Sequence, residues 1–274
     1  MGIAAEEFIS NPQAALAALA WQVDLGVAEV VQETPQNAFD LPEAAPWARR
    51  AAEPAAAQPT PRRAAAAPPP PPAEGPDPVA ASHAAAMACD SLGALKAAIA
   101  AFDLCELKRG ARNTVFADGN PAARVLVLGE APGRDEDLEG RPFVGRAGQL
   151  LDAMFAAIGL SRTSAEAASA LYITNVMPWR PPGNRDPEPS EIAMMRPFVL
   201  RHIELAAPQI IVTLGNTPLE ALTGQRGILS ARGKWTEALG RMVMPMTHPA
   251  YLLRNPAAKR EAWADLLQIK ARLT

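Results

Sequence analysis

Three residues suited to handling a nucleic-acid base stand near segments that we interpret as short buried strands. Phe143 lies between glycines and arginines in RPFVGRAG, where its ring could stack on a base while the arginines contact phosphates. Asn175 ends the apolar segment LYITN, and its carboxamide offers a donor and an acceptor together. His248 follows the segment RMVMPMT. Each has a structural alternative, since a core aromatic, a turn-forming asparagine and a structural histidine are all common.

The loop GEAPGRDED follows the first expected strand and places Glu130 and Glu136 just beyond the carboxyl end of that strand. Its two glycines and proline form a tight turn whose backbone N–H groups can approach a substrate, although such turns are often only solvated loops. The loop lacks the spacing of a phosphate-binding motif. In the loop that we expect after His248, the leucines Leu252 and Leu253 would be misplaced on a surface unless they entered something apolar, such as a base stack.

Strand-like and helix-like segments alternate through the second half of the chain. This pattern predicts an α/β fold with a parallel sheet covered on both faces, in which ligands bind beyond the carboxyl ends of the strands. Expected strands are 124–128, 171–176, 209–214 and 241–246, and expected helices are 86–107, 150–158, 190–204, 218–222 and 255–271.

Composition divides the chain into three parts. We expect a helical segment at 1–40 and a disordered, extended linker at 41–82, where 12 of the 28 prolines fall between residues 41 and 80. A folded domain should occupy 86–274. This part has 19 acidic and 22 basic residues, against 10 acidic and 4 basic in 1–85. Its slightly positive net charge is compatible with binding a polyanion but does not by itself indicate such binding.

Cysteine usage and hydropathy exclude several classes of protein. Two cysteines cannot form a disulfide scaffold or, with three histidines, an ordinary structural zinc site. No apolar run approaches the ~18 residues of a membrane span, and the start lacks the pattern of a signal peptide. We therefore expect a cytoplasmic protein with no membrane partner, acting as a monomer.

Five stretches occur together in an order and spacing that resemble the family 4, iron–sulfur-type uracil-DNA glycosylases. They are GEAPGRDED at 129–137, RPFVGRAGQLLD at 141–152, YITNV at 172–176, RPPGNR at 180–185 and HPAYLLRNP at 248–256. The resemblance covers roughly 100–274. It implies a three-layer α/β/α domain with a four-stranded parallel sheet, and hydrolysis of the N-glycosidic bond of deoxyuridine in DNA to leave an abasic site.

The resemblance also implies roles for individual residues. Phe143 would stack on the flipped uracil, Asn175 would hydrogen-bond its polar edge, and His248 would stabilise charge on the departing base. Glu130 and Glu136 would position water or offset the sugar cation, and Ala131 would border the substrate where other classes place an aspartate. The expected DNA contacts are Arg146, Asn184, Arg185, Tyr251, Leu252, Leu253 and Arg254.

The sequence departs from the family at the residues that ligate its four-iron, four-sulfur cluster. The corresponding positions are Phe102, Cys105, Trp179 and Met195, so one cysteine of four remains. Because such clusters need about four thiolates, we predict that the protein has no cofactor and that an apolar plug fills the volume. Two alternatives stay open: a glycosylase for other deaminated bases, and a non-catalytic DNA-binding repair protein.

Overall fold

The structure, a computed structural model, describes residue 16 and residues 77–274. The expected helical segment at 1–40 and residues 41–76 of the expected linker therefore lie outside the described residues, apart from residue 16. Helix α4 (Pro78–Met87) begins inside the segment that we expected to be linker. Asp77 caps it, because its side chain accepts the Val79 N–H at 2.9 Å, and Pro78 fits the first helical position.

Six strands form one mixed sheet in the order β1-β3-β2-β4-β6-β5. The four central strands are parallel, as expected, and the structure adds an antiparallel strand at each edge. The edge strands have three residues each, too few to show a period in the sequence. The strands are β1 (Ala117–Gly119), β2 (Val125–Gly129), β3 (Leu171–Asn175), β4 (Ile210–Leu214), β5 (Thr236–Ala238) and β6 (Arg241–Met246).

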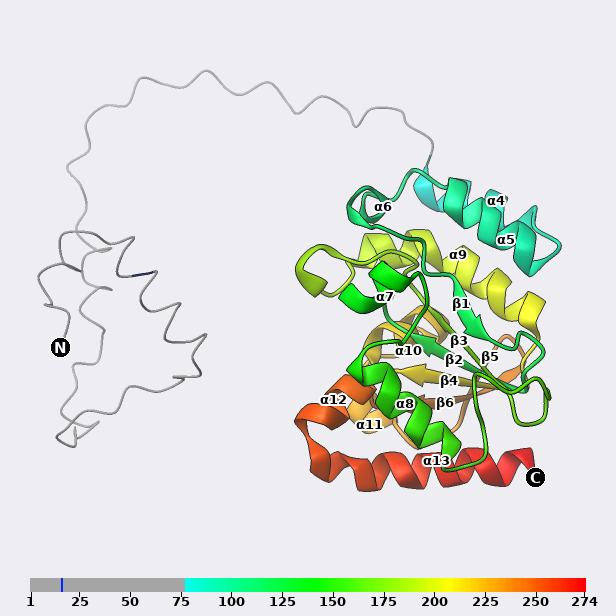
Figure 1. Ribbon diagram of the computed structural model, residues 1–274. Helices are drawn as coiled ribbons and strands as arrows, with labels where there is room; N and C mark the ends of the chain where they lie inside the picture. Colours follow the sequence, from blue (N-terminus) through cyan, green and yellow to red (C-terminus); the bar gives the residue numbers. More distant parts are fainter. Residues whose placement is uncertain (1–15, 17–76) are drawn as a thin grey trace, which may run out of the picture. The chain divides into compact units, whose positions relative to one another are not determined.

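Helices cover both faces of the sheet, which makes the domain three-layered (Figure 1). One face packs on α4, α5 (Leu92–Ala101), α9 (Pro189–Ala206) and α10 (Asn216–Thr223). The other packs on α8 (Arg146–Ala156), α12 (Pro249–Arg254) and α13 (Lys259–Leu273). Successive residues of β2 alternate between the two cores, and all five are buried.

Short elements join these layers. They are α6 (Leu107–Gly110), α7 (Arg134–Glu139), α11 (Ile228–Ala231), η2 (Pro182–Asn184) and η3 (Pro256–Ala258). Two expectations were wrong here. The stretch 86–107 is not one helix, because α4 ends at Met87, Ser91 caps α5, and α5 ends at Ala101. The expected loop after His248 is the short helix α12.

The chain crosses from one side of β2 to the other between β3 and β4, so the carboxyl end of β2 lies at a switch point of the sheet. Ligands of open α/β sheets bind in the crevice at such a point. Within the described residues, no helix is long and apolar enough to cross a membrane.

Candidate active site

A cleft of about 490 Å³ opens at the carboxyl ends of the parallel strands. Phe143, Asn175 and His248 all line it, although they lie on three separate segments of the chain. Its volume falls within the range of about 300–1,000 Å³ that is usual for ligand sites. Other lining residues include Glu130, Ala131, Glu136, Asn184, Arg185, Tyr251 and Arg254.

Phe143 is held in an unusual backbone conformation beside the end of β2. Its φ is +53°, in the left-handed region that a bulky residue seldom adopts, and it is 6% exposed. Its ring stacks on that of His248 with a centroid separation of 5.5 Å. Gly129 allows this approach, because a Cβ there would lie 2.5 Å from Phe143 Cε2 and 2.3 Å from Asn175 Oδ1.

Asn175 ends β3 and places a carboxamide at the cleft. Its Oδ1 is buried and has no hydrogen-bond partner within the part of the chain that the structure describes. Leaving a buried acceptor unpaired costs about 1–3 kcal/mol. Because Asn175 lines the cleft, a bound ligand with a suitably placed donor would recover that cost.

His248 caps the N-terminus of α12 through its ring. Its Nδ1 accepts the Ala250 N–H at 3.1 Å, which places the ring proton on Nε2. The pKa of His248 is lowered to about 4, chiefly by burial and also by the Arg254 cation, while Glu136 opposes both effects. At neutral pH the ring is therefore uncharged and has one N–H left to donate to a ligand.

Glu130 follows β2 directly, and its carboxylate is oriented by a hydroxyl from another element. Thr217 at the start of α10 donates to Glu130 Oε2 at 2.6 Å. Burial raises the pKa of Glu130, while the Thr217 hydrogen bond lowers it. Nothing in the sequence around Thr217 indicated this contact, since 87 residues separate the two. The small side chain of Ala131 borders the cleft next to Glu130.

The family to which this chain belongs follows from sequence comparison. The sequence model of the uracil DNA glycosylase superfamily matches residues 116–267. The chain belongs to the uracil DNA glycosylase superfamily. It is 39% identical over 191 residues to the type-4 uracil-DNA glycosylase of Sulfurisphaera tokodaii, covering 66% of this chain and 84% of that protein.

Two further type-4 uracil-DNA glycosylases are similar to it. The protein of Archaeoglobus fulgidus is 36% identical over 176 residues, which cover 60% of this chain and 84% of the relative. The protein of Thermotoga maritima is 42% identical over 154 residues, which cover 55% of this chain and 77% of the relative.

Within this glycosylase domain, the carboxylate of Glu136 forms hydrogen bonds with the protein backbone. Its Oε1 accepts the N–H groups of Val144 and Gly145 at 3.0 Å each, and its Oε2 accepts the N–H of Gly133 at 3.1 Å. Both carboxylate oxygens therefore shape the loop that carries Phe143. Because both oxygens of Glu136 are used in this way, its hydrogen bonds do not favour the role of positioning water that we expected of it.

The expected DNA contacts differ in where they lie. Asn184, Arg185, Tyr251 and Arg254 line the cleft, whereas Arg146 is exposed at the start of α8 outside it. Arg185 is already paired with Glu191 at 2.6 Å.

The prediction that both leucines enter DNA was wrong for Leu252. Helix α12 turns it into the core, where it is 1% exposed, while Leu253 stays 37% exposed. Because residues on successive helical positions point about 100° apart, one of two adjacent leucines faces the core. Leu253 is therefore the leucine that can reach DNA.

The four positions that correspond to cluster ligands share one apolar core. Phe102, Cys105, Trp179 and Met195 are 8%, 1%, 0% and 1% exposed. The ring of Phe102 meets Phe198 edge-on at 5.3 Å, and Trp179 Nε1 donates to the Thr114 hydroxyl at 3.1 Å.

These positions do not fit an iron–sulfur cluster. Burial raises the pKa of Cys105, which favours the thiol over the thiolate that ligates iron. Among residues 77–274, no three His, Cys, Asp or Glu side chains are grouped so that they could hold a metal ion.

Proposed function

We propose that this chain is a uracil-DNA glycosylase that hydrolyses the N-glycosidic bond of deoxyuridine in DNA, leaves an abasic site, and works without an iron–sulfur cluster. The observation that carries the proposal is the convergence of Phe143, Asn175 and His248 on one cleft. These provide an aromatic face, a carboxamide and an N–H donor, which together match the face and the polar edge of a pyrimidine.

The neutral His248 is suited to the charge that develops on the leaving base. As the bond between C1′ and N1 breaks, negative charge grows on the uracil carbonyl oxygen beside N1. An Nε2–H donor aimed there stabilises this charge, because it is held by the cap to Ala250 and needs no reorganisation. The unsatisfied Oδ1 of Asn175 would accept the uracil N3–H.

Glu130 is suited to the opposite charge. The sugar gains oxocarbenium character as the base leaves, and a carboxylate nearby lowers the energy of that cation. A water held by Glu130 adds its oxygen to C1′ and gives up one proton, while the departing uracil anion takes up a proton. The Thr217 hydroxyl keeps the carboxylate in place.

The iron-free part of the proposal rests on the packing of the four degenerate positions. Three bulky apolar side chains and a buried thiol occupy one core, and one cysteine cannot replace four. Protein purified without oxygen should lack the visible absorption band of a cluster. Stoichiometric iron and a brown colour would contradict this part alone.

Excision assays on oligonucleotides test the reaction itself. Single-stranded and duplex substrates should carry uracil, hypoxanthine, xanthine or a mispaired thymine, with enzyme in excess over DNA. We expect alkali-labile sites at uracil, far slower formation of these sites with His248→Ala, and normal activity with His83→Ala, which changes an exposed histidine on α4. Cutting at another base instead would favour the alternative substrate, and no cutting at all would favour a DNA-binding repair protein. The cytoplasmic location and the monomeric state stay predictions.

A further inference from the structure

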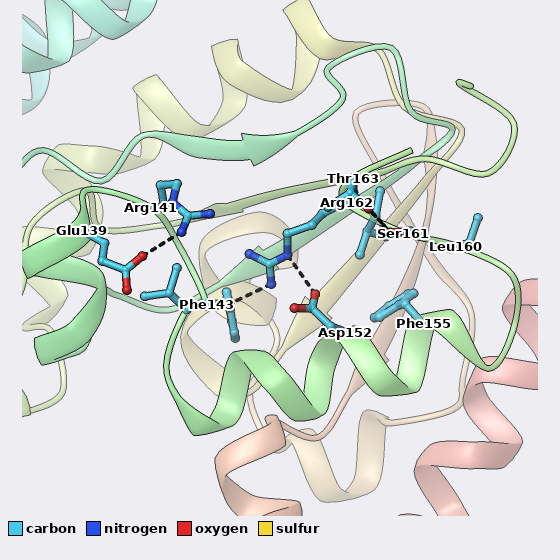
Figure 2. Close-up of a pocket in the computed structure, with 11 residues that line it drawn as sticks. Glu139, Arg141, Phe143, Asp152, Phe155, Leu160, Ser161, Arg162 and Thr163 are labelled. Atoms are coloured by element: carbon cyan, nitrogen blue, oxygen red, sulfur yellow. Dashed lines mark hydrogen bonds and ion pairs between the residues drawn. The ribbon is translucent and has the colours of Figure 1, made fainter. Parts of the chain in front are cut away.

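A second cavity, of about 420 Å³, lies behind the loop that carries Phe143. Phe143 lines both this cavity and the substrate cleft. Figure 2 shows Arg162 extending across the second cavity between Phe143 and Asp152. The Arg162 side chain is 9% exposed, which is low for an arginine.

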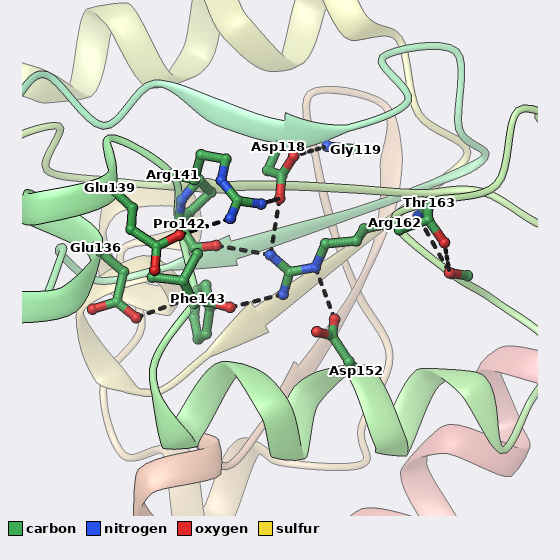
Figure 3. Close-up of polar contacts among 12 residues, drawn as sticks. Asp118, Gly119, Glu136, Glu139, Arg141, Pro142, Phe143, Asp152, Arg162 and Thr163 are labelled. Atoms are coloured by element: carbon green, nitrogen blue, oxygen red, sulfur yellow. Dashed lines mark hydrogen bonds and ion pairs between the residues drawn. The ribbon is translucent and has the colours of Figure 1, made fainter.

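Arg162 bonds two successive backbone carbonyls of the loop. Its Nη1 donates to Pro142 O and its Nη2 donates to Phe143 O, both at 2.9 Å. Two carboxylates compensate its charge: Asp118 at 3.1 Å from Nη1 and Asp152 at 2.8 Å from Nε (Figure 3). The burial of this cation is therefore matched by hydrogen bonds and by opposite charge.

The peptide unit between Phe143 and Val144 is held at both of its polar edges. Arg162 bonds the carbonyl, and Glu136 accepts the N–H of Val144 at 3.0 Å. Gly148 packs closely against the same peptide unit and leaves no room for a side chain, because a Cβ there would lie 1.8 Å from Phe143 O. A left-handed backbone at a residue other than glycine costs about 1–3 kcal/mol, so it persists only where the surroundings enforce it.

We infer that Arg162 is a positioning residue for base excision: by fixing the carbonyls of Pro142 and Phe143, it sets the plane of the ring on which the flipped base stacks. This role rests on the proposed function of the cleft. Arg162 lies on the far side of the loop and does not line the cleft, so it acts only through Phe143.

The planar fork of the guanidinium explains why an arginine is needed. Two parallel N–H donors reach two carbonyls at once, whereas a lysine ammonium is a point charge that keeps the ion pairs but not this geometry. Arg162→Lys therefore preserves the charge next to Asp118 and Asp152 and removes the fixed orientation of the loop.

A matched control is available in Arg232. Its side chain is also mostly buried, at 17% exposure, and it pairs with Asp265 and donates to a backbone carbonyl, that of Glu261, at 2.8 Å. It lines neither cavity. Arg232→Lys should thus reproduce the loss of a buried arginine fork without touching Phe143.

The experiment combines single-turnover excision with amide hydrogen exchange of residues 141–148 in the full chain. We expect Arg162→Lys to slow excision at saturating enzyme by about 10- to 100-fold, since small misplacements of substrate-orienting groups have effects of this size. Exchange of the loop amides should accelerate, and affinity for DNA with an abasic-site analogue, which has no base to stack, should be unchanged. Arg232→Lys should change neither the rate nor the loop exchange.

Two results would overturn the inference. One is an Arg162→Lys protein that excises uracil as fast as the parent, and the other is a slow protein whose loop amides exchange as before. If the parent protein itself excises no base, the proposed function fails, yet the exchange measurement still tests whether Arg162 holds the loop.

Discussion

Two regions of the domain illustrate two uses of buried space. Within residues 77–274, the buried Asn175 Oδ1 in the cleft has no hydrogen-bond partner. The same holds for the buried Thr213 Oγ1 and Thr247 Oγ1, which adjoin the cleft residues Leu214 and His248 in the sequence. In the region around Phe102, Cys105, Trp179 and Met195, which we call the packed region, the buried side chains fit together and Trp179 Nε1 is bonded.

This difference indicates that the packed region serves stability and that the cleft serves function. Every buried side-chain N or O atom without a partner in residues 77–274 lies on or just after β3, β4 or β6, towards the end of the sheet where the cleft opens. Unpaired buried groups of this kind are typical of functional sites, where a ligand, an ion or water completes them. Changes in the packed region should therefore cost stability, and changes in the cleft should cost activity.

The largest expected effect is on stability, from Trp179→Ala. Removing a fully buried indole leaves a cavity and frees the Thr114 hydroxyl, so the free energy of unfolding should fall by about 3–5 kcal/mol. Excision per folded molecule should stay normal. Trp263→Ala, which removes a 44% exposed indole, is the control for denaturant unfolding. A comparable loss in both variants would contradict the assignment of Trp179 to the packed region.

The next largest effect is expected on activity, from His248→Ala in the cleft. His248→Ala removes the donor for the leaving base, and loss of such a donor slows reactions by about 10²–10³-fold. The dissociation constant for uracil-containing DNA should change much less, because the charge on the base develops only in the transition state. Quantitative binding and single-turnover rates measure the two quantities. Equal losses in binding and rate would show that His248 only binds.

A third prediction compares the histidines of the two regions. His202 on α9 bonds the Tyr172 hydroxyl at 2.9 Å and stacks on Phe116 at 4.5 Å, and burial lowers its pKa, like that of His248, to about 4. The folded state thus binds fewer protons than the unfolded state, whose histidines titrate near 6.5. The contribution of the two neutral, buried histidines to the free energy of unfolding is therefore fully present above pH 6.5 and is lost as the pH falls towards 4.

The loss should be on the order of 1–3 kcal/mol for each histidine. Glu130, whose pKa is raised, changes stability in the opposite sense, so variants must be compared with the parent. Chemical denaturation from pH 7 to 4 should show a shallower fall for His248→Ala, and likewise for His202→Gln. Curves parallel to that of the parent would contradict the lowered pKa values.

The smallest effect on stability is expected from Asn175→Ala. Deleting an unpaired amide relieves a desolvation cost that offsets the lost packing, so stability should change by less than about 1 kcal/mol while excision slows at least tenfold. Asn113 serves as the control, because its side-chain amide is hydrogen-bonded within the protein: Nδ2 donates to Asp137 O at 2.7 Å. Asn113→Ala should lower stability by about 1 kcal/mol and leave excision unchanged. The reverse pattern would remove the distinction between the two regions.

The sequence allowed much of this structure to be predicted, for physical reasons. The strands of the parallel core are continuous apolar runs because both faces are buried, and β6 lies at the residues expected. The convergence of Asn175 and His248 was predictable because the carboxyl ends of parallel strands share one edge, whereas Phe143 lies in the loop between α7 and α8 and reaches that edge from there. The three-residue edge strands and α12, by contrast, leave no period to detect.

Contacts distant in the sequence were not predictable. The hydroxyl of Thr217 on Glu130 and the fork of Arg162 on the loop of Phe143 depend on how helices and loops meet in space, and neither residue lies in a distinctive local pattern. The opposite burial of Leu252 and Leu253 depends on α12 being helical. The resemblance assigned Glu136 to positioning water or offsetting the sugar cation, whereas both of its oxygens accept hydrogen bonds from backbone N–H groups.

The most direct test of the central claim is a crystal structure of the protein bound to DNA that carries an uncleavable deoxyuridine analogue. The account predicts that the uracil ring stacks on Phe143, with its polar edge within hydrogen-bond distance of the Asn175 carboxamide and a carbonyl oxygen near His248 Nε2. A base bound elsewhere, or left in the helical stack, would contradict it.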